Sequence, residues 1–484
     1  MLEGAPILGA PFCIQCRKLQ RFCEKHRDSL QLSQESVIFL KRKEPVAKMG
    51  KGIAVNLIIH MNTLVITIIS VLYVYQMGYI GVVFIGEYIR KRRKKHHAEP
   101  IIKTNRYAAI ISARNESSVI GQLLDTIKAQ TYPAEFLDAI VIADNCTDNT
   151  AQVARDHGAI VYERFNKEQV GKGYALDYLF TKLKEGVGDD YYDAYVIIDA
   201  DNLLDEHFFE AVNKTFCQGY RIMTTYRNSK NFATNWISAG YSLWFLREAK
   251  FLNNARMMLG TSCAVSGTGF VVASAVIRER GGWPYHLLTE DIEFTVDTVI
   301  HGEMIGYCGD AMLYDEQPTT FSQSWTQRMR WAKGFYQIVA NYGGKLSSGI
   351  VTKRHIKKLA SYDLTMTVMP GMLITMGILA IDLVILLMGV FGSLYMPHMI
   401  QTMLSSLGFW LLGYYGSLFL MGLVTIISER KKIRNCPTWK RVLYTFTFPL
   451  FQLTYLPIAV AALFRKVEWK PIKHEVSKSL DEIR

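Results

Sequence analysis

The chain has 484 residues and a formal net charge of +12 at pH 7, and half of its residues are hydrophobic. Because this length exceeds what one hydrophobic core usually organises, we expect a soluble domain together with membrane segments. The positive charge gathers in short runs beside apolar stretches, such as Arg90 to Lys95 and Glu429 to Arg434, which indicates the cytosolic face of a membrane and no nucleic-acid partner. The eight cysteines are scattered, which argues against a disulfide-stapled secreted module.

Residues 1–52 are predicted to form an N-terminal tail with a cysteine and histidine motif. The run CIQCRKLQRFCEKH has the C-x-x-C and C-x-x-H spacing that can close a tetrahedral zinc site, with Cys13, Cys16, Cys23 and His26 as ligands. The loop between the two pairs is shorter than in common zinc fingers. Two alternatives are an unstructured tail and a natural start at Met49, which would remove the motif.

A first transmembrane helix is predicted over residues 53–89. No charged residue occurs from Ile53 to Gly86, and roughly 20 apolar residues suffice for one helix to cross a bilayer. The stretch lies too far into the chain, and is too long, to be a cleavable signal peptide. The basic run that follows predicts a cytosolic position for the next segment.

Residues 100–345 have the composition of a soluble α/β domain that ends in interfacial helices. Strand-like apolar runs, YAAIISA, AIVIAD and AYVIIDAD, alternate with stretches of helical period. This order predicts a mostly parallel sheet with helices on both faces. Ligands bind at the carboxyl ends of the strands in such sheets, and the polar clusters ARNE, DNCTDNT and DADN fall there.

Residues 346–484 are predicted to form a membrane region and a short basic tail. About three apolar stretches cover residues 364–391, 405–427 and 442–464. The basic loop after the second stretch predicts a cytosolic position, whereas three crossings would leave the basic tail outside. Either the last stretch, which contains Pro449 and Pro457, is re-entrant, or the charge rule fails at this tail. Asp382 lies inside the first stretch and is expected to be functional or paired, because a charge in lipid is costly.

Two carboxylates end the hydrophobic run VIIDAD. Asp199 and Asp201 project from a strand end, where Mg²⁺ or Mn²⁺ can bridge them to a diphosphate. The cation would neutralise the charge that develops on a nucleotide leaving group. The alternative is an acidic turn without a metal.

Other candidates follow the neighbouring predicted strands. Asp144 ends a buried run and therefore lies at the expected ligand crevice, whereas Asp148 has the setting of a helix cap. Lys172 stands between two glycines before a helical pattern, which suits phosphate contact at a helix N-terminus. The spacing of a P-loop is absent, which argues against an ATPase.

Two further clusters lie nearer the membrane region. In LTEDIEF, a positioned carboxylate can take the proton from an attacking sugar hydroxyl, although a cap for the next helix explains the pattern equally well. Gln327, Arg330 and Trp331 share one helical face, where arginine can hold a diphosphate by a forked contact and the indole can cover a sugar ring. The alternative is an interfacial helix with an aromatic anchor.

Six motifs occur in one order between about residues 105 and 335: ISARNE, ADNCTDNT, VGKGYAL, DADN, LTEDIEF and QRMRW. In this combination the chain resembles the processive family-2 glycosyltransferases, which include cellulose, hyaluronan and poly-N-acetylglucosamine synthases. The resemblance implies a GT-A fold between transmembrane helices. It also implies an inverting transfer from a UDP-sugar with Mg²⁺ or Mn²⁺.

The resemblance assigns roles to residues of this chain. Asp291 would be the general base, with Glu290 beside it in the catalytic site. The donor-binding residues would be Asp144, Lys172, Asp199, Arg114 and Glu116, and the metal ligands would be Asp201 and Asp199. The acceptor end and the pyrophosphate would lie against Gln327, Arg330, Trp331 and Gly267. The motif SARNE and the segment SGTGF depart from common family forms, which leaves the role of Arg114 and the product open.

The leading hypothesis is a synthase of the plasma membrane, from a bacterial source, that extends a β-linked polysaccharide and passes it outward. UDP-glucose is the first expected donor and UDP-N-acetylglucosamine the next, and accessory export proteins are compatible partners. One alternative is a non-processive transferase with a lipid acceptor. Another is a transporter or receptor with a sugar-binding domain, which would not require Asp199, Asp201 and Asp291 together.

Overall fold

The computed structural model describes residues 27–93, 102–352, 358–369, 377–378, 380–387, 397–468 and 478–483. The four predicted zinc ligands, Cys13, Cys16, Cys23 and His26, lie outside these residues. The chain divides into one unit of Met1–Thr67 with Ile378–Gly408 and a second unit of Ile68–Gly377 with Phe409–Arg484.

The second unit is built around a mixed sheet of eight strands in the described part of the chain, in the order β3-β2-β1-β4-β7-β6-β8-β5. One half is parallel and consists of β3 (Ile160–Arg164), β2 (Leu137–Asp144), β1 (Tyr107–Ala113) and β4 (Ala194–Asp199). The other half consists of β7 (Phe270–Ala273), β6 (Ile222–Ser229), β8 (Ile305–Asp315) and β5 (Leu203–Leu204). In it β7 runs antiparallel to both of its neighbours.

Successive residues of β1 pack into different cores, which explains why the strand has no polar face. Tyr107, Ala109 and Ile111 join the core on one side of the sheet, and Ala108 and Ile110 join the core on the other side. Strands covered on both faces read as continuous apolar runs. The predicted helices on both faces and the parallel half of the sheet are confirmed. The sheet as a whole is mixed, because β7 runs antiparallel to both of its neighbours and β5 runs antiparallel to β8, which the sequence did not predict.

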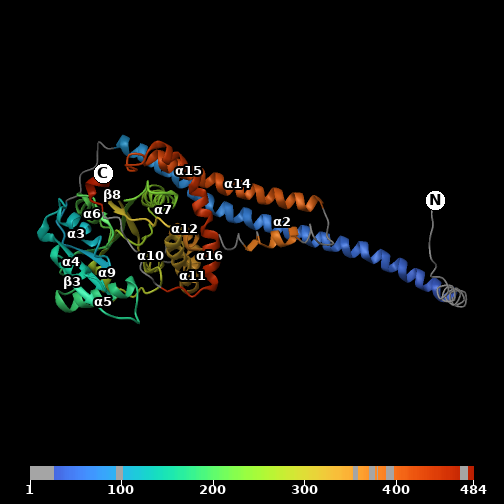
Figure 1. Cartoon of the computed structure of the whole chain (residues 1–484), viewed down its shortest axis with the longest axis horizontal. Coiled ribbons are helices and arrows are strands. Elements are labelled where there is room, and N and C mark those ends of the chain that lie inside the picture. Colours follow the sequence, from blue (N-terminus) through green and yellow to red (C-terminus); the bar gives the residue numbers. More distant parts are fainter. Residues whose placement is uncertain are drawn as a thin grey trace, which may run out of the picture. The chain divides into compact units, whose positions relative to one another are not determined.

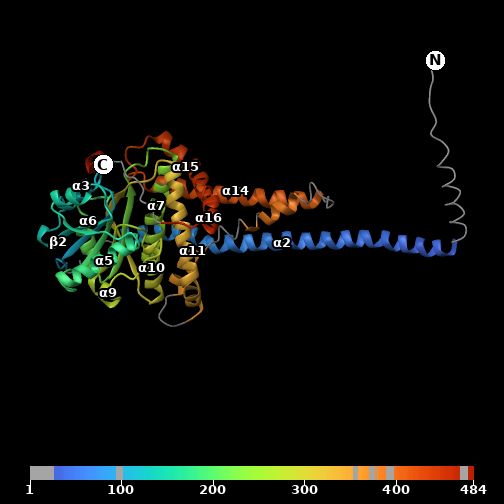
Figure 2. The same cartoon turned by 60° about the horizontal axis from the view of Figure 1, so that its bottom comes forward.

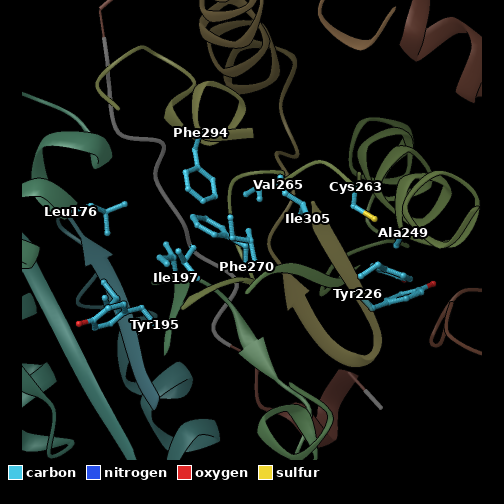
Figure 3. Packing of buried hydrophobic residues seen from close by; sticks show 14 of the residues in the cluster. Leu176, Tyr195, Ile197, Tyr226, Ala249, Cys263, Val265, Phe270, Phe294 and Ile305 are labelled. Atoms are coloured by element: carbon cyan, nitrogen blue, oxygen red, sulfur yellow. The ribbon is translucent and has the colours of Figure 1, made fainter. Parts of the chain in front are cut away.

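Helices cover both faces of this sheet (Figure 1). One face carries α3 (Ile120–Lys128), α4 (Thr150–Asp156) and α6 (Phe208–Phe216). The other carries α5 (Lys172–Gly186), α7 (Trp236–Arg247), α9 (Ser274–Glu279) and α10 (Glu290–Ile300). Aromatic rings dominate this second core, where Phe294 of α10 lies over Phe270 of β7 with ring centroids 6.1 Å apart (Figure 3).

Three short helices complete the α/β domain. They are η1 (Ala134–Phe136), the π-helix η2 (Glu248–Asn253) and α8 (Asn254–Met258). The long helix α11 (Phe321–Val351) starts at a capping box in which Thr320 and Gln323 bond each other's backbone. It lies alongside α10 (Figure 2) and continues towards α12 (Lys358–Val368).

The remaining helices, apart from a short one at the C-terminus, contain the apolar stretches of the chain. They are α2 (Arg27–Arg93), α14 (Pro397–Ser428), α15 (Thr438–Leu453) and α16 (Tyr455–Phe464). Among the described residues, three segments are long and apolar enough to cross a membrane: Leu57–Arg92, Met403–Ser428 and Thr438–Phe464. These helices suggest membrane association. The predicted stretch at residues 364–391 lies partly outside the described residues.

Within the first unit, the predicted pairing of Asp382 is confirmed. The side-chain amide of Asn62 donates to Asp382 Oδ1 at 2.6 Å. This bond gives the carboxylate a polar partner inside an otherwise apolar segment, as its cost in lipid requires.

The end of the chain returns to the α/β domain. Backbone carbonyls of the last apolar stretch accept hydrogen bonds from α11, with Arg328 bonded to Phe451 at 3.1 Å and Tyr336 to Ala459 at 2.9 Å. The short helix α17 (Leu480–Ile483) follows, and Ile483 packs with Leu203 and Tyr314 at the sheet edge.

Candidate active site

The two carboxylates of the run VIIDAD lie in a loop that is locked to a neighbouring segment. Asp199 ends β4, and its backbone N–H donates to Thr268 Oγ1 at 2.9 Å. Thr268 Oγ1 in turn donates to Asn202 at 2.6 Å. Asp201 is only 4% exposed and accepts from the backbone N–H of Glu316 at 3.3 Å. Both carboxylates therefore have defined positions at the carboxyl end of the sheet.

Lys172 lies at the start of α5 because the two glycines around it allow a close approach. Gly171 has a φ of 137°, which side chains other than hydrogen disfavour. A Cβ at Gly173 would lie 2.0 Å from the carbonyl oxygen of Tyr285. In this position Lys172 Nζ donates to Asp199 Oδ1 at 2.5 Å and to the carbonyl oxygen of Gly267 at 2.8 Å. Lys172 thus connects three segments that the sequence singled out: VGKGYAL, DADN and SGTGF.

Burial disfavours the charged ammonium of Lys172, but the carboxylates of Asp199 and Glu290 outweigh this effect and raise its pKa. The lysine is therefore a fixed positive charge at the centre of the cluster. Its charge suits contact with a phosphate, as the sequence predicted.

Glu290 and Asp291 form the first turn of α10. Burial, together with the neighbouring charge of Asp291, raises the pKa of Glu290 to about 7. Burial also raises the pKa of Asp291, which keeps a partly exposed side chain. A Cβ at Gly267 would lie 3.9 Å from Asp291 Oδ2, so the SGTGF segment passes directly beside this carboxylate.

The N-cap position of α10 belongs to Thr289, which makes no side-chain capping hydrogen bond, and Asp291 is the second helical residue. Asp148 precedes Asn149, the N-cap residue of α4, and its Oδ1 accepts from the backbone N–H of Thr150, the first residue of that helix, at 3.1 Å. The LTEDIEF motif thus supplies the N-cap residue of α10, and its two carboxylates lie in the first turn of that helix.

The helix α11 is held against this turn by a close contact. A Cβ at Gly334 would lie 2.4 Å from Thr289 Oγ1, so a side chain here would push α11 away from α10. Arg330 is near enough to lower the pKa values of both Glu290 and Asp291 by its charge, although burial of these carboxylates has the larger, opposite effect. The helix therefore adds a cation to the carboxylate pair.

The other two residues of the QRMRW motif share this region. The ring of Trp331 meets those of Tyr241 and Phe245 edge-on, with centroids 5.8 Å and 6.3 Å apart. Gln327 has a buried side-chain oxygen without a hydrogen-bond partner among the described residues. A buried acceptor of this kind is costly unless a ligand satisfies it.

Asp144 ends β2 at the same edge of the sheet, but it is already paired. Its Oδ1 accepts from Arg164 Nη1 at 2.6 Å, and both side chains are nearly fully buried. The pairing follows from the parallel register of β2 and β3, in which these two residues are opposite each other. Arg114 and Glu116 follow β1, next to this pair in the sheet order.

The sequence of this region matches that of a known family. Residues 105–334 match the profile of a family described as Glycosyltransferase like family 2. This part of the chain is a family 2 glycosyltransferase domain. Together with its mixed sheet, the match establishes the predicted GT-A fold and makes the protein a hexosyltransferase.

The chain has distant relatives among known and probable glycosyltransferases. It is similar to the probable glycosyltransferase YdaM of Bacillus subtilis, with 23% identity over 76% of this chain and 84% of YdaM. The β-monoglucosyldiacylglycerol synthase of Synechocystis is 25% identical over 48% of each chain. The poly-β-1,6-N-acetyl-D-glucosamine synthase of Staphylococcus epidermidis is 21% identical over 48% of this chain and 54% of the synthase. The last two matches span about half of each relative.

Solved glycosyltransferases resemble the chain more loosely. The mannosyltransferase PcManGT from Pyrobaculum calidifontis, in complex with GDP-Man and Mn²⁺, has a TM-score of 0.48 and 17% identity. The match covers 83% of this chain and 99% of that one.

The glycosyltransferase site contains charged residues that the sequence analysis missed. Arg227 of β6 donates two hydrogen bonds to the carboxylate of Asp315 at the end of β8, one of them from Nε at 2.7 Å. It also donates to the carbonyl oxygen of Ser266 at 2.9 Å. Burial raises the pKa of Asp315 to about 6, although the Arg227 guanidinium opposes this shift. Lys230 follows β6 directly and is 5% exposed.

A sequence signal for these residues existed. The runs YRNSK and LYDEQ each place charges directly after an apolar strand, as DADN does. That β6 and β8 are adjacent, and end beside Asp201, depends on a crossover that local patterns do not reveal.

The donor set suits a hard divalent cation. Asp199 and Asp201 offer two carboxylates, and a diphosphate and water can complete the octahedral shell that Mg²⁺ demands. Among the described residues, no group of three or more His, Cys, Asp and Glu side chains is arranged to hold a metal.

Proposed function

We propose that the chain is a membrane-embedded, inverting glycosyltransferase that polymerises a UDP-sugar into a β-linked polysaccharide and passes it across the membrane. The observation that carries this proposal is the convergence of Lys172 on Asp199 at 2.5 Å and on Gly267 at 2.8 Å, with Asp291 on the other side of the same glycine. A donor-side cluster and a candidate base thus share one small space. UDP-glucose is the expected donor, and UDP-N-acetylglucosamine is the next.

In this proposal Asp291 is the general base. Its carboxylate is partly exposed, and Lys172 and Arg330 are close enough to favour its ionised form. It would accept the proton of the acceptor hydroxyl while that oxygen attacks the anomeric carbon. Glu290, whose pKa is about 7, would remain largely protonated beside it in mildly acidic solution.

The donor would lie along the carboxyl ends of the parallel strands. Asp144, Arg114 and Glu116 at the ends of β2 and β1 would contact the nucleoside, and Lys172 would contact the diphosphate. Asp199 and Asp201 would hold Mg²⁺ or Mn²⁺, which neutralises charge on the departing UDP when bound.

The acceptor end would lie against α11 and the SGTGF segment. The buried acceptor oxygen of Gln327, unpartnered among the described residues, and the half-buried indole of Trp331 support this assignment, since sugars offer hydroxyl donors and apolar ring faces. Gly267 would keep the floor of this space free of side chains, because its φ of 77° lies in the left-handed region that favours glycine.

The apolar helices support a membrane location with the glycosyltransferase domain in the cytosol. The basic run at Arg90 to Lys95 follows the first of them and agrees with the charge rule for cytosolic loops.

A second candidate is the non-processive transfer of one hexose to a lipid. It is favoured by the resemblance to β-monoglucosyldiacylglycerol synthases, one of which, from Nostoc, is 25% identical over 66% of this chain and 69% of its own length. The chemistry at Asp291 is the same in both candidates. Only the acceptor differs.

The deciding experiment measures UDP release by the purified protein in detergent with Mn²⁺ or Mg²⁺. UDP-glucose, UDP-N-acetylglucosamine, UDP-galactose and UDP-glucuronate are compared, and the product is sized and extracted into organic solvent. A long, water-soluble polymer from one donor supports the synthase. An extractable monoglycosylated lipid supports the second candidate, and no turnover with any donor and lipid acceptor refutes both.

A further inference from the structure

A cavity of 230 Å³ is lined by none of the residues assigned to the donor, the metal or the acceptor. Its wall comes from three segments: residues 228–234 at the end of β6, residues 432–435 in the loop between α14 and α15, and the C-terminal segment at residues 478 and 482–483. This volume is smaller than the roughly 300–1,000 Å³ of pockets for drug-sized ligands. It suits a phosphate group with a small organic substituent.

Hydrogen bonds join the three segments of the wall. The side-chain amide of Asn228 donates to the carbonyl oxygen of Lys432 at 3.2 Å, which ties β6 to the loop. The side-chain amide of Asn435 donates to the carbonyl oxygen of Glu482 at 3.0 Å, which ties the loop to α17. The loop is therefore fixed on one side to the glycosyltransferase sheet and on the other side to the C-terminal segment.

The wall of the cavity is strongly basic. Four of its residues are cationic and one is acidic: Lys230, Lys432, Arg434 and Lys478 against Glu482. The carboxylate of Glu482 accepts from the backbone N–H of Ser479 at 2.8 Å, at the start of its own helix α17. Like charges that gather around one cavity repel one another, and a bound anion removes this repulsion.

The four cations differ in their neighbours. Lys432 pairs with Glu429 at 3.3 Å, and Glu429 does not line the cavity. Lys230 is buried and interacts electrostatically with carboxylates outside the cavity wall. Arg434 and Lys478 have exposed side chains and come from opposite sides of the cavity wall, the loop and the C-terminal segment. These two cations are thus the best placed to meet a ligand.

The basic loop follows an apolar helix. The segment Met403–Ser428 of α14 is long and apolar enough to cross a membrane, and the loop residues Lys432 and Arg434 come shortly after its end. Basic pockets at the cytosolic end of membrane helices suit the phosphate headgroups of anionic lipids, because these lie at the same depth. A soluble phosphate ester has the same chemistry but reaches the cavity from solution.

We propose that this cavity binds a phosphate-bearing anion, and that the anion is the headgroup of an acidic phospholipid. Arg434 would hold the phosphate by a forked contact and Lys478 by a charge-assisted hydrogen bond. The bound headgroup would link the loop after α14 to the C-terminal segment. The lipid source rests on the proposed membrane location, whereas the anion site is independent of the proposed sugar transfer.

The test measures binding to the full-length protein in detergent by calorimetry. The probes are dioctanoyl-phosphatidylglycerol, dioctanoyl-phosphatidylcholine as a lipid without net charge, and glycerol phosphate as a soluble phosphate ester. The double variant Arg434→Gln/Lys478→Gln should weaken phosphatidylglycerol binding by about tenfold or more, because two cations near the headgroup are lost. Phosphatidylcholine should bind weakly and equally to every form of the protein.

The matched control is Arg430→Gln/Lys431→Gln. Both residues are exposed and belong to the same basic loop, but neither lines the cavity. The control makes the same change in net charge, so it separates a site in the cavity from general attraction between a basic loop and an anionic lipid. Its affinity for phosphatidylglycerol should match that of the wild type. The thermal unfolding midpoint without probes shows that each variant is folded, and the single changes Arg434→Gln and Lys478→Gln replace the double variant if it unfolds.

The outcomes separate the site, its source and the proposed function. Loss of phosphatidylglycerol binding in the cavity variant but not in the control supports the inference. If glycerol phosphate binds the wild type as tightly as phosphatidylglycerol, the phosphate site stands and the lipid assignment is wrong. Equal losses in both variants, or a wild type that binds neither phosphate probe, would overturn the inference. UDP release is measured on the same samples, and its absence would count against the proposed function alone.

Discussion

Replacing Glu290 by Gln should make the stability of the protein less sensitive to pH. The side chain is buried beside Asp291, and burial together with that neighbouring charge raises its pKa from the usual 4.5 to about 7. A glutamine has nearly the same shape but cannot ionise. The substitution therefore removes the cost of charging this group without removing much packing.

The sign and size follow from linkage. A carboxyl whose pKa is raised on folding stabilises the folded state fully below pH 4.5, and this contribution is lost as the pH rises through about 7. The difference between the pKa of Glu290 in the folded protein and its usual value corresponds to about 3 kcal/mol of unfolding free energy, at about 1.4 kcal/mol for each pKa unit. As the pH rises from 5 to 8, the wild type loses this contribution and Glu290→Gln does not. The stability of the variant relative to wild type should therefore rise by about that amount over this range.

The assay is the thermal unfolding midpoint of both proteins in the same detergent at pH 5 and pH 8. With roughly 2–4 °C for each kcal/mol in a domain of this size, the advantage of the variant should grow by about 6–12 °C between the two pH values. Comparison at each pH cancels the titrating groups that do not interact with Glu290. An advantage that stays the same at pH 5 and pH 8 would refute the reasoning, because Glu290 would then be ionised in the folded protein at both.

Three further predictions concern catalysis. Asp291→Asn should lower kcat in the UDP-release assay by roughly 10²- to 10⁴-fold and leave UDP affinity within a few-fold; unchanged turnover would remove Asp291 as the base. Gly334→Val should lower turnover by displacing α11, because a Cβ there would lie 2.4 Å from Thr289 Oγ1, and equal turnover in the variant would mean that α11 adapts without loss. Chelation of divalent cations should abolish UDP release and added Mn²⁺ should restore it, with Asp201→Asn requiring more Mn²⁺ than wild type; activity that persists in excess chelator would contradict the metal assignment.

Local patterns in the sequence determined the strands of the parallel half and the polar residues that follow them. The run YAAIISA is β1 to the residue, because a strand buried on both faces must be apolar throughout. The clusters around Asp144 and Asp199 lie at the carboxyl ends of β2 and β4, because parallel strands end at one edge. The shared helical face of Gln327, Arg330 and Trp331 likewise follows from the helical period alone.

Only the tertiary structure decided which of these groups meet and which others join them. The pairing of Asp144 with Arg164, and of Arg227 with Asp315, depends on strand register across crossovers. The contact between Gly334 and Thr289 depends on how two helices pack. Such contacts link residues 20 to 88 positions apart, and their energies depend on burial that the whole fold creates.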